Sequence, residues 1–113
     1  MTKVFAEERE SCFTLILYGH ATGSEKVCAA ISSIVYALAG YLKNVEDERG
    51  EKPPVIQLKS GFSSFRFSGK EAKSAYDMAV IGLMQLEKQY PEFIQFEKNK
   101  NFLDFRGANE KEL

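Results

Sequence analysis

Residues 18–42 read YGHATGSEKVCAAISSIVYALAGYL, and this stretch determines how the flanking segments must pack. The β-branched and aromatic run CFTLILY at residues 12–18 leads into it and predicts a buried strand. After a break with two glycines, Ser24 is a suitable helix N-cap, because its hydroxyl accepts hydrogen bonds from free amides of the first turn. Apolar residues then recur at helical spacing as far as Leu42. We therefore expect a strand, a tight connection and a long apolar helix.

The segments on either side predict two hairpins. Residues 2–7 alternate apolar and polar and indicate an edge-like strand, paired with residues 12–18 across a turn at 8–11. Residues 55–59 and 62–67 form the second hairpin around Ser60 and Gly61. Its inward set is expected to be Ile56, Leu58, Phe65 and Phe67.

The remaining segments complete the order ββαββαβ. A charged loop is expected at residues 44–54, and SGKE at 68–71 matches a capping box that opens a second helix, which ends before Pro91. Residues 93–106 alternate again and predict one or two further strands, while 107–113 are expected to form a frayed tail. We thus predict an α+β fold in one domain, residues 1–106, with a mostly antiparallel sheet and two helices on one face.

Composition excludes several classes of protein. A hydrophobic content of 44% and a net charge of −1 are ordinary for a globular domain and give no general attraction to nucleic acid. Acidic residues follow Lys3 closely, so no signal peptide is expected, and the longest apolar stretch is interpreted as too short to span a membrane. Cytoplasmic location, two free thiols and the absence of any metal or cofactor are therefore the expectations.

Nucleophilic chemistry is the sharpest hypothesis for the junction. Cys28 is expected near the start of the first helix, where free amides and the helix dipole favour a thiolate. The histidine of the chain, His20, lies in the preceding loop and would serve as base toward that thiol. Glu25 would oppose thiolate formation by its charge but could orient His20, and Ser32 shares the helix face of Cys28.

The alternative is that Cys28 and His20 have structural roles and no catalytic one. A cysteine among alanines is commonly a small core residue, and a histidine in a loop is commonly solvated. The second cysteine, Cys12, lies within a strand and is expected in the core. From spacing alone, both interpretations of Cys28 and His20 remain open.

The motifs GHA at residues 19–21 and VCAAIS at 27–32 resemble the ribosomal-processing cysteine protease family, called Prp. The resemblance extends over nearly the whole chain. It implies that Cys28 is the nucleophile and His20 the catalytic histidine, with Ser32 matching a serine one turn later. Relative to that family, the connection between His20 and Cys28 is shorter, and Glu25 stands where aspartate is usual.

The resemblance also implies a substrate and a partner. Members of the family remove an N-terminal extension from a large-subunit ribosomal protein, so this chain is expected to be a cysteine endopeptidase that acts on such a precursor. A homodimer is expected from the family and from the apolar first helix. The alternative is a peptide-binding module of the same fold in which the shorter connection has disabled Cys28 and His20.

Overall fold

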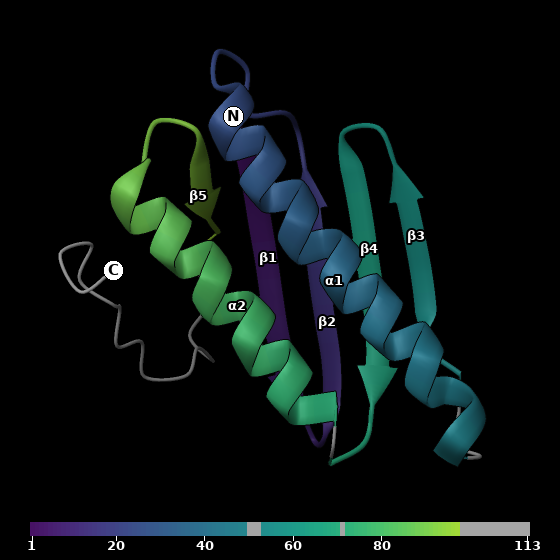
Figure 1. Cartoon of the computed structure of the whole chain (residues 1–113). Helices are drawn as coiled ribbons and strands as arrows, with labels where there is room; N and C mark the ends of the chain where they lie inside the picture. The colour runs from purple at the N-terminus through teal and green to yellow at the C-terminus, as the bar shows by residue number, and fades with distance from the viewer. Residues whose placement is uncertain (50–52, 71, 98–113) are drawn as a thin grey trace, which may run out of the picture.

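The computed structural model describes residues 1–49, 53–70 and 72–97. Its elements follow the predicted order, with two helices packed on one face of a sheet (Figure 1). The elements are β1 Thr2–Arg9, β2 Cys12–Tyr18, α1 Glu25–Arg49, β3 Val55–Lys59, β4 Phe62–Ser68, α2 Ala72–Gln89 and β5 Ile94–Phe96. The predicted α+β fold is therefore confirmed. The capping box at 68–71, the later part of the 93–106 segment and the tail at 107–113 fall wholly or partly outside the described residues.

The sheet has the strand order β3-β4-β2-β1-β5. All neighbours are antiparallel except β1 and β5, which are parallel, with Thr2 opposite Ile94. The expectation that residues 2–7 form an edge-like strand was wrong, because β5 pairs with the outer side of β1. Three residue pairs with β5, which is distant in sequence, make β1 an interior strand of the sheet.

The core lies between the sheet and the helices and follows from strand alternation. In β2, Phe13, Leu15 and Leu17 are buried, and their neighbours in sequence face the other side of the sheet. Phe67 and Phe65 of β4 pair with Phe13 and Leu15 in register, so one apolar layer runs across both strands. The helices cover this layer with buried side chains: Val27, Ile31, Val35, Leu38 and Leu42 from α1, and Tyr76, Ala79, Val80 and Leu83 from α2.

Cys12 does not belong to this core. It was expected to be buried, but it is exposed, because the alternation that buries Phe13 turns Cys12 toward the opposite face. Leu58 is a second correction. It lies on the helix side of β3, as predicted, yet it is 37% exposed because no helix covers that end of the hairpin. Alternation accounts for the first error, whereas the second depends on which part of the sheet a helix covers, which alternation alone does not specify.

Helix α1 runs to Arg49, so the start of the predicted loop at 44–54 is helical instead. No glycine or proline occurs between Gly40 and Gly50 to end the helix, and the Asn44 side chain donates to the Gly40 carbonyl at 2.7 Å. The segment Glu25–Val45 is also long and apolar enough to cross a membrane, contrary to the sequence interpretation. Length and composition are weak evidence here, because Val27, Val35 and Leu38 pack in the domain core.

The turn between β1 and β2 is unusually tight for its sequence. Arg9 pairs with Cys12, so only Glu10 and Ser11 connect the strands, with φ values of 52° and 64°. Two successive positive φ angles are the pattern of a type I′ hairpin turn, which favours Asn-Gly. Neither side chain suits this backbone, so the turn stores conformational strain.

We predict that the double substitution Glu10→Asn and Ser11→Gly raises the free energy of unfolding by about 1–2 kcal/mol, because it relieves this strain. Chemical denaturation measures the gain. Ser11→Ala retains a Cβ and serves as the matched control without gain. An unchanged stability of the Asn-Gly variant would contradict the account of the turn.

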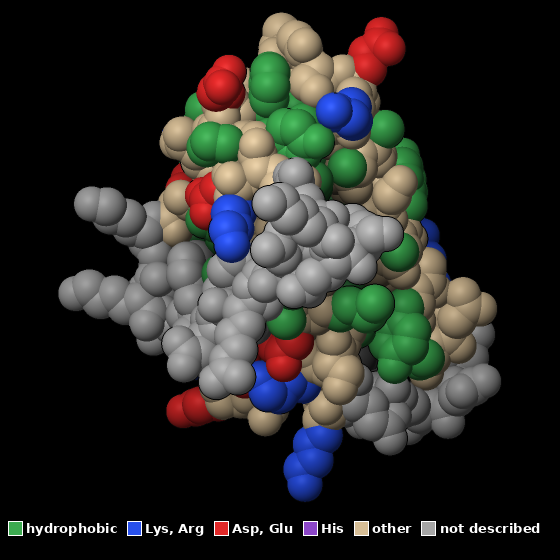
Figure 2. All heavy atoms as spheres, turned by 60° about the vertical axis from the view of Figure 1, so that its left-hand side comes forward, with side chains coloured by type: hydrophobic (Ala, Val, Ile, Leu, Met, Phe, Trp, Pro, Cys, Tyr) green, Lys and Arg blue, Asp and Glu red, His purple; other side chains and the backbone are tan. Residues whose placement is uncertain are grey.

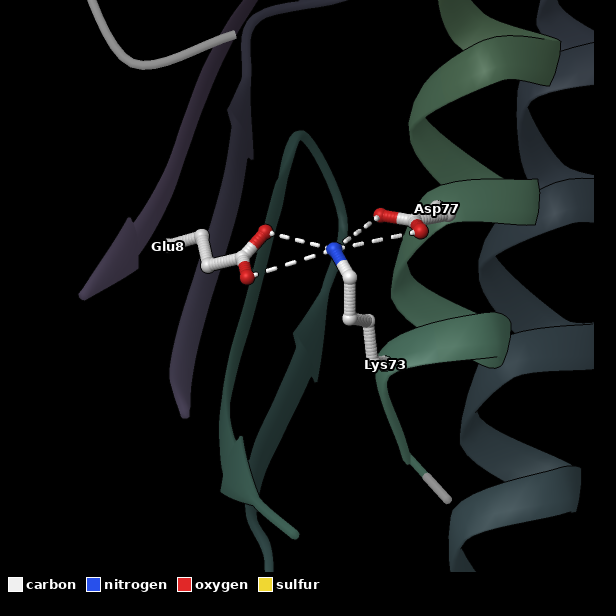
Figure 3. Close-up of polar contacts among 3 residues, drawn as sticks. All are labelled: Glu8, Lys73 and Asp77. Carbon is white, nitrogen blue, oxygen red and sulfur yellow. Dashed lines mark hydrogen bonds and ion pairs between the residues drawn. The ribbon is translucent and has the colours of Figure 1, made fainter. Parts of the chain in front are cut away.

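An ion-pair cluster ties the end of β1 to the start of α2 (Figure 3). The Lys73 ammonium lies 3.0 Å from Glu8 Oε1 and 3.3 Å from Asp77 Oδ2, and the hydrogen bond to Glu8 is the main reason that the pKa of Lys73 is raised. Beneath it, Tyr76 packs on Phe13 with ring centroids 4.9 Å apart. Burial, aided by the nearby carboxylates of Glu8 and Asp77, raises the pKa of Tyr76 to about 12.

This shift predicts a loss of stability in alkali. The folded chain holds the Tyr76 proton more tightly than the unfolded chain, whose tyrosine pKa is about 10. The stabilisation is complete below about pH 10 and disappears as the pH rises toward about 12, by about 2–3 kcal/mol in total. In urea titrations, Tyr76→Phe should remove this part of the pH dependence. Tyr36→Phe, at a residue that is 66% exposed, should retain it, and equal pH profiles for wild type and Tyr76→Phe would refute the prediction.

Candidate active site

A groove of about 450 Å³ opens where α1 leaves the end of the β3–β4 hairpin uncovered. One wall is the first half of α1 and the other is the hairpin tip at Ser60 and Gly61. Leu17 of β2 and Ser63 of β4 also line it. Both His20 and Cys28 line this groove, so the structure brings the two predicted residues to one site from a loop and a helix.

The loop that carries His20 is fixed through Gly19. The Gly19 amide donates to the Gly61 carbonyl at 2.9 Å, and the buried Thr2 hydroxyl donates to the Gly19 carbonyl at 3.4 Å. Gly19 has a φ of 90°, and a Cβ there would collide with the Met1 carbonyl oxygen. Only glycine fits this position without strain, which gives a physical reason for the first residue of the GHA motif.

Cys28 is fixed by the capped start of α1. As predicted, Ser24 is the N-cap, since its Oγ accepts from the Val27 amide at 3.2 Å and its carbonyl accepts from the Cys28 amide at 3.1 Å. Val27 is fully buried, which anchors the first turn on the sheet. Cys28 is the next residue and is exposed, so its sulfur is accessible from the groove.

Of the two further candidates, Ser32 lies in the groove and Glu25 does not. Ser32 lines the groove one helical turn after Cys28, and Tyr36 lies one turn beyond Ser32 on the same wall. Glu25 is exposed and does not line the groove. Among the described residues Glu25 makes no hydrogen bond or ion pair with His20, so no contact supports its predicted role of orienting the imidazole.

The imidazole and the thiol share the groove without a direct hydrogen bond in the described part of the chain. A histidine and an exposed cysteine beside a helix N-terminus are the minimum set for thiol nucleophilic catalysis, and the hydrogen bond of such a pair often forms only with substrate bound. Lys59 is the charged side chain of the wall opposite α1, and no carboxylate among the described residues lines the groove. Within the described ranges, no three His, Cys, Asp or Glu side chains gather as metal ligands.

Several groove residues escaped the sequence interpretation. Ser60 and Gly61 were recognised as a hairpin turn, but nothing local indicates that this turn reaches His20. Thr2 and Tyr36 also line the groove without any motif to mark them. Tyr36 lies on the exposed face of α1, and Leu58 was expected to be buried, so local sequence marks neither of them as a groove residue.

Comparisons with known proteins identify relatives of this chain. The family model described as Cysteine protease Prp matches residues 1–95. A search of curated proteins finds no match.

Among solved structures, the ribosomal processing protease Prp from S. aureus with a covalently linked product peptide has a TM-score of 0.68 and 22% identity, covering 88% of this chain and 100% of that one. The same enzyme with a substrate peptide gives 0.62 and 21% identity, with 88% and 100% coverage. SMU.848 from Streptococcus mutans gives 0.62 and 22% identity, with 86% and 92% coverage. At these identities the likeness establishes the fold.

Proposed function

Since the chain belongs to the Prp family of cysteine proteases, we propose that it is a cysteine endopeptidase with Cys28 as nucleophile and His20 as general base. We further propose that its substrate is a large-subunit ribosomal protein precursor, from which it removes an N-terminal extension. The observation that carries the proposal is that one groove holds His20 and the exposed Cys28 together with Ser32.

The proposed reaction proceeds through an acyl-enzyme. His20 takes the thiol proton, and Cys28 Sγ attacks the scissile carbonyl carbon to form a tetrahedral intermediate. The intermediate collapses to a thioester as the C–N bond breaks, and His20 returns the proton to the leaving amine. Water, deprotonated by His20, then attacks the thioester, which releases the second product and the thiol. Each step uses only the peptide, water and these two side chains.

Amides at the start of α1 are the proposed donors to the tetrahedral oxyanion. Ser24 already accepts from the amides of Val27 and Cys28, so these two are engaged. The amides of Glu25 and Lys26 precede them in the first turn, where an α-helix offers no intrahelical acceptor. They are therefore better placed to stabilise developing negative charge near Cys28 Sγ.

The shape of the groove suits an extended peptide. Cys28, Ser32 and Tyr36 follow one face of α1, and from Cys28 to Tyr36 the helix rises by about 12 Å. Three or four extended residues cover about this length. S. aureus Prp has been solved with a substrate peptide and with a covalently linked product peptide, which supports a peptide occupant for the corresponding groove here.

We predict that Cys28→Ala and His20→Ala each lower the rate of peptide cleavage by about 10⁴-fold, because each removes half of the nucleophilic pair. The assay is mass spectrometry of a synthetic peptide that spans the extension of the ribosomal precursor. Cys12→Ser is the matched control, since Cys12 is the other exposed cysteine and is placed outside the groove. Cleavage by Cys28→Ala at the wild-type rate would refute the proposed nucleophile.

The alternative is a peptide-binding module of the same fold. It is favoured by the connection at residues 22–24, which is shorter than in the family that the motifs resemble. Titration of the same peptide against wild type separates the two functions. Binding without cleavage would favour the module, whereas turnover favours the peptidase.

We also propose that the chain forms a homodimer in the cytoplasm. An apolar groove of about 480 Å³ lies between α1 and α2, and Met78 and Tyr41 on its rim are 79% and 41% exposed. Hydrophobic side chains also appear on the surface seen from the α2 side (Figure 2). A second copy of the same face would cover this apolar area. The net charge of −1 gives no reason to expect nucleic acid as a further partner.

Sedimentation velocity at micromolar concentration should therefore show a dimer, and Met78→Glu should shift it to a monomer, because burying a charge in the contact is costly. Val55→Glu is the matched control, since Val55 is 58% exposed on β3 and lies away from the helices. A wild-type chain that sediments as a monomer would contradict the proposed dimer.

A further inference from the structure

Gly61 makes an unusual contact with the histidine. It forms the tip of the β3–β4 hairpin, with a φ of 72°. A Cβ built on Gly61 would lie 2.6 Å from His20 Nε2, 3.1 Å from its Cε1 and 3.2 Å from its Cδ2. The Nε2 edge of the imidazole therefore packs directly against the backbone of Gly61, in space that every other residue type would occupy.

The same residue also holds the backbone beside His20. The carbonyl oxygen of Gly61 accepts the hydrogen bond from the Gly19 amide at 2.9 Å. This bond continues the β2–β4 ladder by one step beyond its last register pair, Tyr18 and Phe62. Gly61, at the tip of a different hairpin, therefore contacts both the backbone next to His20 and the end of the His20 side chain.

The two glycines with positive φ nearest to His20 in sequence, Gly19 and Gly23, do not share this arrangement. Gly23 has a similar φ of 95° and lies in the same connection, but a Cβ there would meet only Phe93 Cε1, at an ordinary distance of 3.6 Å. At Gly19 the three atoms nearest to an added Cβ all belong to the backbone of Met1 and Thr2. The close approach to the imidazole is a property of Gly61 within the described residues.

We propose that Gly61 is a positioning residue for His20: the hairpin tip fixes where the imidazole rests in the groove, and glycine is required there to leave it room. The proposal builds on the proposed function, in which His20 is the general base. Lys59, Ser60 and Phe62 flank Gly61 and also line the groove, so a peptide that binds there contacts the segment that sets the histidine.

A side chain at position 61 would displace the His20 ring more than it would destabilise the fold. The atoms that a Cβ would strike form the free end of a rotatable side chain, which can swing away at little cost. The remaining penalty is the left-handed backbone, which disfavours alanine more than asparagine, because asparagine tolerates this conformation. Displacement of a general base by about 1 Å costs up to about 10²-fold in rate.

The test compares Gly61→Ala and Gly61→Asn with Gly23→Ala in the full chain. The chain contains one histidine, so ¹³C-labelled histidine gives a single Cε1–Hε1 NMR signal that reports on His20 alone. Thermal unfolding monitors the fold. Gly23→Ala introduces the same left-handed strain without the imidazole contact, and Gly61→Asn introduces the contact with less strain.

We expect both Gly61 variants to move the His20 signal at fixed pH and to lower kcat by about 10- to 100-fold with KM little changed, while Gly23→Ala matches wild type. A wild-type signal in Gly61→Ala, or full recovery in Gly61→Asn, would overturn the proposal, since strain alone would then explain any loss. The NMR arm needs no turnover. If wild type fails to cleave the peptide, the proposed function falls while this arm still decides the role of Gly61.

Discussion

The antiparallel pairing of β2 with β4 is the constraint on which the candidate site depends. It runs from Cys12 opposite Ser68 to Tyr18 opposite Phe62, and it aligns the buried Phe13 and Leu15 with Phe67 and Phe65. A shift by one residue would turn the apolar side chains of β4 to the other face, so burial fixes the register strongly. The same register ends β2 and begins β4 at one level of the sheet.

Because the strands end together, the loop after β2 meets the turn before β4. The hydrogen bond from the Gly19 amide to the Gly61 carbonyl is the next step of the same ladder. From there the chain has only a few residues before α1 begins, and the Ser24 cap with buried Val27 places Cys28 on the groove wall. A sheet register set by aromatic burial thus determines where a thiol and an imidazole lie.

Most of this could be predicted from local sequence. Alternation in β2 and β4, the Ser24 cap and the helical recurrence in α1 are short-range patterns, and they produced the correct element order. The motifs around His20 and Cys28 also indicated the family that the comparison over residues 1–95 identifies. Local patterns do not show which strand or helix packs against a given residue. Leu58 and β1 were misjudged because burial there depends on which strand or helix lies alongside, whereas Cys12 was misjudged although alternation in β2 turns it away from the core.

The contact between Gly61 and His20 could not be predicted for the same reason, since it joins the ends of two different hairpins. Helix α1 exceeded its expected end because a polar run without glycine or proline continues a helix once it is nucleated. The contacts that arrange the candidate site join residues far apart in sequence, whereas local sequence patterns determine the strands and helices that bring those residues together.

The most direct test of the account is the rate at which iodoacetamide alkylates Cys28 at neutral pH, measured by mass spectrometry in a Cys12→Ser chain with and without His20→Ala. If the groove makes His20 the base for the Cys28 thiol, loss of the imidazole should slow alkylation by about tenfold or more. Equal rates in the two chains would contradict the claim that these residues act together.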